Sequence, residues 1–141
     1  MRSFRQITSA AIVTLGIFSA VTYTACSKTT ADANAQFLGT YTANESCNPT
    51  VTGSGWTSAI TASSAGANSI VISNFGGSSQ SVTATVTSNG TLTIPTSTIT
   101  SGTTVSTVSG SGSISNNTIT IVYTLTNTSY SGTCTQTLIK Q

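Results

Sequence analysis

Hydroxyl-bearing and apolar residues alternate one by one along most of this chain. Ser and Thr alternate with Val and Ala over 81–87, and with Ile, Tyr and Leu over 118–126, where Val122 is the main exception. Successive side chains of a β-strand point to opposite faces, so a period of two predicts strands with one apolar and one polar face. No segment after residue 26 shows the period of an amphipathic helix. The chain is therefore predicted to be all-β, with antiparallel strands.

Turn-forming residues separate the alternating segments at the spacing of hairpins. Asn89-Gly90 suits a two-residue type I′ turn, and Gly76-Gly77 and Asn116-Asn117 would connect strands in a similar way. The segment 49–55 is expected to be a looser connection, and Pro95 predicts a bulge or an edge position. The pattern predicts a meander of about eight strands, at roughly 38–47, 56–63, 69–75, 80–88, 91–100, 103–115, 117–127 and 132–140.

Two of the three cysteines lie near opposite ends of this meander. Cys47 ends the first predicted strand and Cys134 begins the last, so a disulfide between them would make those strands neighbours. The first and last strands of a meander are neighbours only if the sheet closes or nearly closes. We therefore expect a Cys47–Cys134 disulfide and a small barrel, closed or nearly closed. A β-sandwich that carries the same disulfide between its sheets is the alternative.

The third cysteine, Cys26, follows a segment typical of an export signal. Two arginines, Arg2 and Arg5, precede an apolar stretch over 10–21, and Ala25 stands directly before Cys26. The apolar stretch is shorter than the roughly 20 residues of a membrane-spanning helix. The order resembles the signal of a bacterial lipoprotein, whose cysteine is acylated and becomes the mature N-terminus.

This resemblance implies a signal peptide over 1–25, a lipid-anchored flexible tether over 26–36 and a single barrel domain over 37–141. It also implies a protein of the cell envelope, attached through the lipid on Cys26 to a membrane, which we expect to be the outer membrane. Acylation of Cys26 would leave an even number of cysteines, as an exported protein favours. The alternative is cleavage after Ala35, at the small-x-small pattern Ala33-Asn34-Ala35, which would release a soluble exported protein.

The start of the predicted barrel carries a second resemblance. Gly39 and Tyr41 stand in a Gly-x-aromatic motif that is similar to the opening of a lipocalin-like barrel, with Tyr in place of the usual Trp. No Arg near the C-terminus can stack on this aromatic ring, and Lys140 is the only basic candidate. As a whole, the layout resembles small lipoproteins of Bacteroidetes-type bacteria with a lipocalin-like barrel. That resemblance implies a fold and no activity.

Charged residues are too few for several classes of function. After Cys26 the only charged side chains are Lys28, Asp32, Glu45 and Lys140, and the chain has no histidine. A nucleic-acid partner needs a basic face to neutralise phosphates. Paired-carboxylate and triad mechanisms need acids or bases that this chain lacks, as do zinc and calcium sites. We therefore expect a non-enzyme with no cofactor, no metal and no nucleic-acid partner.

Aromatic residues are the remaining candidates for binding. Trp56 follows Gly53-Ser54-Gly55 at a predicted strand start and could lie at the barrel rim, while Tyr41 and Tyr123 lie on apolar faces. Glu45 is expected at the rim or as a polar contact in the barrel mouth. The leading hypothesis is a monomeric, non-catalytic barrel that binds a small apolar ligand. The alternative is a structural or adhesive surface protein with a filled core, and the volume of the interior discriminates between them.

Overall fold

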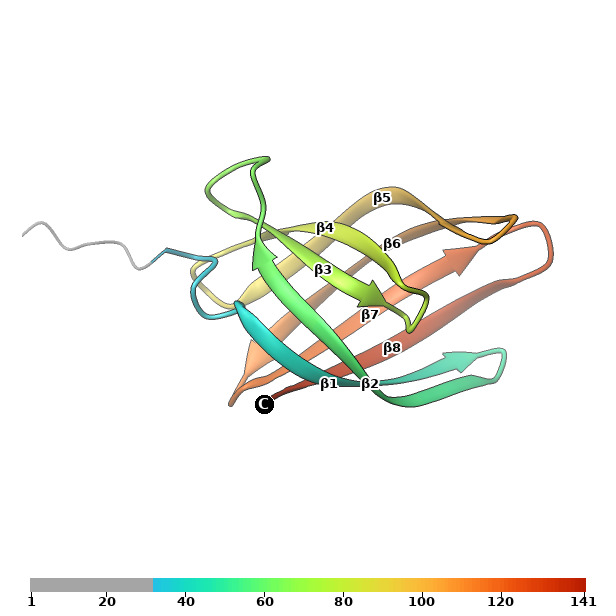
Figure 1. The fold of residues 1–141 in the computed structure, drawn as a ribbon, viewed down its shortest axis with the longest axis horizontal. Helices are drawn as coiled ribbons and strands as arrows, with labels where there is room; N and C mark the ends of the chain where they lie inside the picture. The colour runs from blue at the N-terminus through green and yellow to red at the C-terminus, as the bar shows by residue number, and fades with distance from the viewer. Residues whose placement is uncertain (1–31) are drawn as a thin grey trace, which may run out of the picture.

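Eight antiparallel strands follow one another around a closed barrel in the computed structural model, which describes residues 32–141 (Figure 1). Each strand pairs with the next, and the last pairs with the first. The meander prediction is confirmed, and the β-sandwich alternative is wrong. The strands are β1 (Gly39–Asn48), β2 (Val51–Ala62), β3 (Ser69–Phe75), β4 (Gln80–Val86), β5 (Thr91–Ser101), β6 (Thr104–Ser115), β7 (Thr118–Thr126) and β8 (Ser131–Lys140).

The predicted strand bounds agree with these within about two residues at every end except one. β2 begins at Val51, where the sequence suggested a looser connection over 49–55. The reason is a tight turn, because Cys47 already pairs with Val51 and only three residues lie between them. Pro95 lies where the pairing of β5 with β6 shifts, between Ile94 and Ser97, so the bulge expected there is confirmed.

Of the predicted hairpin turns, Asn116-Asn117 has the type I′ conformation, and Asn89-Gly90, the strongest candidate for it in the sequence, does not. Asn116 and Asn117 both have positive φ, 47° and 64°, and they connect the paired residues Ser115 and Thr118. Positive φ at both central residues is the signature of a type I′ turn. At Asn89-Gly90 only the glycine has positive φ, 77°, and the Gly90 amide donates to the Thr87 carbonyl. That connection is therefore longer, and its glycine supplies the left-handed residue that ends it.

A disulfide joins the two strands that close the barrel. Cys47 and Cys134 are direct partners in the ladder between β1 and β8, their Cα atoms lie 3.9 Å apart, and their sulfurs are bonded. The predicted disulfide and the predicted neighbourhood of the first and last strands are both confirmed. The bond links residues 87 positions apart, so it encloses most of the barrel in one loop.

The period of two places apolar side chains in the barrel interior. On β7, Ile119, Ile121 and Tyr123 are buried and Thr120 and Thr124 are exposed. β4 alternates in the same way, and Ile, Val, Leu and Ala supply most of the buried side chains on the other strands.

Two glycines of β6 make room for the large inward side chains of β7. Gly110 pairs with Tyr123, and Gly112 pairs with Ile121. A Cβ atom on Gly110 would lie 2.4 Å from the Val122 carbonyl oxygen, and one on Gly112 would lie 2.3 Å from the Thr120 carbonyl oxygen. The two strands therefore approach more closely than side chains on β6 would allow. β6 continues through both glycines with unbroken pairing to β7.

One end of the barrel is closed by the segment that precedes β1. Phe37 is fully buried, and Ala33 and Asn34 are buried beside it. The Asn34 side-chain amide donates to the Ser69 carbonyl at 3.3 Å, and that of Gln36 donates to the Thr87 carbonyl at 3.0 Å. Figure 1 shows this segment, in blue, at the left end of the barrel.

The folded domain therefore begins before Phe37. We expected it to begin at Phe37, after a flexible tether over 26–36. The last residues of the expected tether, 33–36, pack against the barrel because Ala33 and Asn34 cover its apolar end. The contact was not predicted because this segment is polar and shows no periodic pattern of apolar residues. Cys26, the expected signal peptide and the first residues of the tether lie outside the described residues. In the described part, no helix is long and apolar enough to cross a membrane.

Candidate functional site

A cavity of about 310 Å³ lies at the end of the barrel opposite Phe37. The turns from β3 to β4, from β5 to β6 and from β7 to β8 surround it, at the right end of the barrel in Figure 1. We call this end the mouth. The volume falls at the lower limit of small-molecule sites, which is roughly 300 Å³. The barrel is therefore filled at one end and hollow at the other.

The wall of the cavity combines an apolar interior with a polar rim. Phe75, Ile99, Tyr123 and Leu125 supply the apolar surface. Hydroxyl, amide and backbone groups surround it, from Gly76, Ser78, Ser101, Thr104, Ser106 and Asn127. The one charged side chain among the described residues that line the cavity is Glu45. Apolar walls with a few placed polar groups are the usual composition of a small-molecule site.

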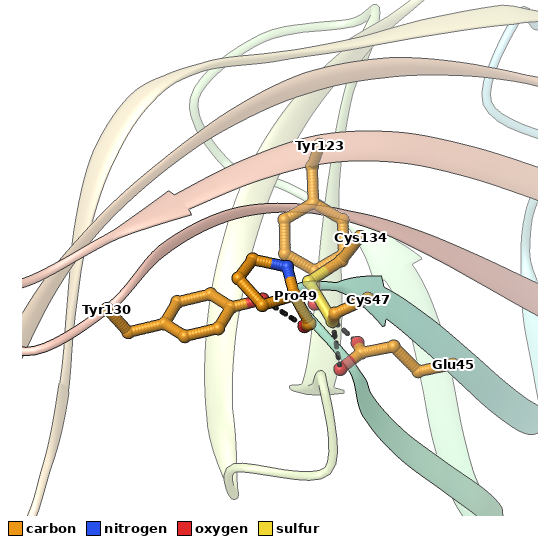
Figure 2. Close-up of a disulfide and its surroundings, with 6 residues drawn as sticks. All are labelled: Glu45, Cys47, Pro49, Tyr123, Tyr130 and Cys134. Atoms are coloured by element: carbon orange, nitrogen blue, oxygen red, sulfur yellow. Dashed lines mark hydrogen bonds between the residues drawn. A yellow bond between two sulfur atoms is a disulfide. The ribbon is translucent and has the colours of Figure 1, made fainter.

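Glu45 and Tyr123 form the polar contact at the centre of this wall. Their positions on β1 and β7 point inward, and the Tyr123 hydroxyl donates to Glu45 Oε2 (Figure 2). The Tyr123 ring packs on Phe75 with the ring centroids 4.6 Å apart. Gly76 leaves room for the pair, because a Cβ atom there would lie 3.1 Å from the Tyr123 oxygen and 3.3 Å from Glu45 Oε2. Of the two positions expected for Glu45, a rim residue or a polar contact in the barrel mouth, the structure shows the polar contact.

Burial changes the ionisation of both groups. Removal from water raises the pKa of Glu45, and the hydrogen bond from Tyr123 lowers it by a smaller amount. The pKa of Tyr123 is also raised, first by burial and then by the hydrogen bond to Glu45 and the negative charge of that residue. Tyr123 therefore keeps its proton and acts as the donor to the carboxylate.

The disulfide lies next to this pair. Glu45 Oε1 is 3.4 Å from Cys47 Sγ, which carries no proton because it is bonded to Cys134, so the contact is not a hydrogen bond (Figure 2). Glu45 and the two cysteines have ligand-type atoms within 4.8 Å of one another, yet the disulfide leaves the carboxylate as the only free ligand. This cluster therefore does not constitute a metal site.

A further hydrogen bond links two turns at the mouth. The Tyr130 hydroxyl donates to the Pro49 carbonyl at 3.1 Å (Figure 2). Tyr130 lies between β7 and β8, and Pro49 lies between β1 and β2. The hydrogen bond and the disulfide together fix the rim of the barrel on the side of Glu45.

Of the three aromatic residues proposed for binding, only Tyr123 lines the cavity. Tyr41 is fully buried at the closed end, where its hydroxyl donates to the Phe37 carbonyl at 2.6 Å, so its proposed role in ligand binding is not supported. The Lys140 ammonium lies 6.0 Å from the Tyr41 ring centroid, so this lysine does lie over the aromatic residue of the Gly-x-Tyr motif.

Trp56 lies near the mouth but outside the cavity wall. It is half-buried and packs against Gly77 of the turn between β3 and β4, where a Cβ atom would lie 3.5 Å from the indole. The indole covers a glycine turn and does not line the cavity, so the proposed role of Trp56 in ligand binding is not supported either. Sequence position alone could not distinguish a ring that covers a turn from one that lines a hollow.

Gln136 is a residue of the interior that the sequence reasoning missed. It is fully buried on β8, and neither atom of its side-chain amide has a hydrogen-bond partner among the described residues. Its partner in the ladder with β1 is Glu45. A signal was present in the sequence, because Gln136 interrupts an apolar face between Cys134 and Leu138.

The described residues thus include a hollow mouth, a half-buried carboxylate held by a tyrosine, and a buried amide beside it. Comparison of the chain with protein-family models, with curated proteins and with solved structures finds no match.

Proposed function

We propose that this barrel is a non-catalytic module that binds a small apolar ligand in the cavity at its mouth. The observation that carries the proposal is the cavity itself, about 310 Å³ in volume, with Phe75, Ile99 and Leu125 in its wall. Transfer of an apolar molecule from water to such a wall is favourable, by about 25 cal/mol for each Å² of apolar surface buried. The polar groups of the rim would orient the bound molecule.

A binding role agrees with the chemical groups that the chain contains. The sequence has no histidine to act as a base, and two of its cysteines form the disulfide. Glu45 is a single carboxylate, whereas mechanisms that use carboxylates as acid and base need a pair. We therefore propose no reaction at this site.

We further propose that the protein is a cell-envelope lipoprotein, anchored through Cys26, with the outer membrane as the expected membrane. The order of charged, apolar and small residues before Cys26 supports this proposal, and so does the disulfide, which exported compartments favour. Residues 33–37 pack across the closed end, so the anchoring segment would leave the barrel there. The mouth would then lie at the end remote from the anchor, open to molecules in solution.

A structural or adhesive role is the second candidate, and one observation favours it. The half of the barrel that contains Phe37 and Tyr41 is filled by side chains, as a scaffold would require. Its outer face carries hydroxyl groups together with exposed apolar residues such as Val122 and Ile139. The cavity at the mouth separates the two candidates, because a scaffold has no need for a hollow interior.

Isothermal titration calorimetry with hexan-1-ol, on the protein purified after expression of the full chain, tests the ligand-binding proposal. Leu125→Trp replaces an aliphatic side chain of the cavity wall with a larger indole ring. Val122→Trp places the same ring on the exposed face of the same strand. We expect the wild type and Val122→Trp to bind hexan-1-ol with similar affinity, and Leu125→Trp to lose binding. Equal binding by all three proteins would show that the cavity is not the site.

A further inference from the structure

The carboxylate of Glu45 has one oxygen that no described residue satisfies. Oε2 accepts the hydrogen bond from Tyr123, whereas Oε1 faces the Cys47 sulfur at 3.4 Å, which has no proton to donate. Glu45 lines the cavity, so this oxygen belongs to a group that a molecule in the cavity can contact. A half-buried carboxylate with a free acceptor favours a donor that carries positive charge.

The amide of Gln136 gives a second, independent sign of a polar group inside the barrel. Its side chain is fully buried, and both amide atoms lack a partner among the described residues. An unsatisfied buried polar group is costly, so native proteins nearly always pair it with protein, water or ligand. Gln136 pairs with Glu45 in the ladder between β1 and β8, and both side chains belong to the inward face. Gln136 is not among the residues that line the cavity, so it adds an unsatisfied polar group next to Glu45 in the ladder and does not itself belong to the cavity wall.

The charge of this region selects among polar groups. Glu45 is the charged residue of the described cavity wall, and Lys140 belongs to the closed end, where it pairs with Tyr41. A ligand with a carboxylate or phosphate would bring a second negative charge next to Glu45 in a place partly shielded from water, which is unfavourable. An ammonium group would donate to Glu45 Oε1, while its apolar body contacts Phe75 and Leu125.

We infer that the ligand of the mouth is a small amphipathic amine, with its ammonium group on Glu45 and its apolar body in the cavity. This inference rests on the proposed ligand-binding function and specifies the chemical class of the ligand. An ammonium next to Glu45 would also stabilise the ionised form of the carboxylate, whose pKa burial raises.

Three probes with equal chain length and different head groups test the inference. Hexylamine, hexan-1-ol and hexanoate are titrated at about pH 7 into the protein purified after expression of the full chain. We expect hexylamine to bind about tenfold more tightly than hexan-1-ol, because a charge-assisted hydrogen bond is about twice as strong as a neutral one. Hexanoate should bind most weakly of the three.

One variant assigns the preference to Glu45. Glu45→Gln should bind hexylamine and hexan-1-ol equally. Gln36→Met is the control, because Gln36 is exposed at the closed end, and it should leave all three affinities unchanged.

The outcomes separate this inference from the proposed function. If hexan-1-ol binds as tightly as hexylamine, or if Glu45→Gln keeps the preference for the amine, the inference is wrong and the ligand-binding proposal stands. If none of the three probes binds, the proposed function itself is wrong.

Discussion

Glu45 is a carboxylate that the fold holds partly out of water, and this single residue connects the stability of the barrel with its proposed function. Tyr123 donates to one of its oxygens, and the other faces a sulfur that cannot donate. Burial raises the pKa of Glu45, so the folded state favours the protonated carboxyl more than the unfolded chain does. A group kept at a cost to stability is often one that function requires.

The raised pKa of Glu45 predicts a particular dependence of stability on pH. Between the pKa of the unfolded chain, about 4.3, and the higher pKa of the folded protein, the folded state binds more protons. The free energy of unfolding therefore falls as pH rises through this interval, and the loss is constant above it. Glu45→Gln keeps an acceptor for Tyr123 but cannot ionise. We expect this variant to gain more in melting temperature over the wild type at about pH 7 than at about pH 3. The same difference at both pH values would contradict the prediction.

At the scale of the strands, alternation in the sequence was sufficient to predict most of the structure. Each face of β7 follows from the period of two, because a strand with one buried face needs an apolar residue at every second position. The turn between Asn116 and Asn117 illustrates what alternation leaves open. By residue type both this pair and Asn89-Gly90 are suited to a type I′ turn, and only Asn116-Asn117 has positive φ at both residues.

Substitutions on opposite faces of β7 test this account of the strand. Ile121 is fully buried and Thr120 is exposed. Ile121→Ala should lower the free energy of unfolding by roughly 2–5 kcal/mol, because it leaves a cavity in the packed interior. Thr120→Ala should change it by no more than about 0.5 kcal/mol. Urea unfolding of both variants provides the measurement. A larger effect at Thr120 than at Ile121 would mean that the hydroxyl face is a packed interface.

For the molecule as a whole, barrel closure was predictable and the functional site was predictable only in part. Cys47 and Cys134 indicated closure because a disulfide between the ends of a meander requires the end strands to meet. The contact of Glu45 with Tyr123 joins residues 78 positions apart and depends on the register of β1, β7 and β8 together. The volume of the cavity depends on side chains near three turns that are far apart in the sequence. No local sequence pattern therefore predicts it.

The disulfide should contribute substantially to the stability of the closed barrel. It joins residues 87 positions apart, and a loop of that length corresponds to about 4.6 kcal/mol in the chain-entropy model. Cys47→Ser combined with Cys134→Ser should lower the free energy of unfolding by a few kcal/mol and leave the far-ultraviolet circular dichroism spectrum of the folded protein unchanged. A double variant as stable as the wild type would show that strand pairing alone maintains closure.

The proposed lipid anchor predicts the chemistry of the mature N-terminus. Mass spectrometry of the protein from its native membranes should find acylated Cys26 as the first residue. Cys26→Ser should release the protein from the membrane or leave the precursor uncleaved. Protein that begins at Gln36 and is fully soluble would instead support cleavage after Ala35 and contradict the lipoprotein proposal.

The most direct test of the central proposal is a crystal structure of the protein with 6-bromohexan-1-ol, recorded at the bromine absorption edge. The anomalous signal locates the bromine atom without reference to any assumed pose. Our account predicts one peak inside the mouth, within the cavity lined by Phe75, Ile99 and Leu125. An empty cavity in crystals that hold the compound only on the outer face would contradict ligand binding in the barrel.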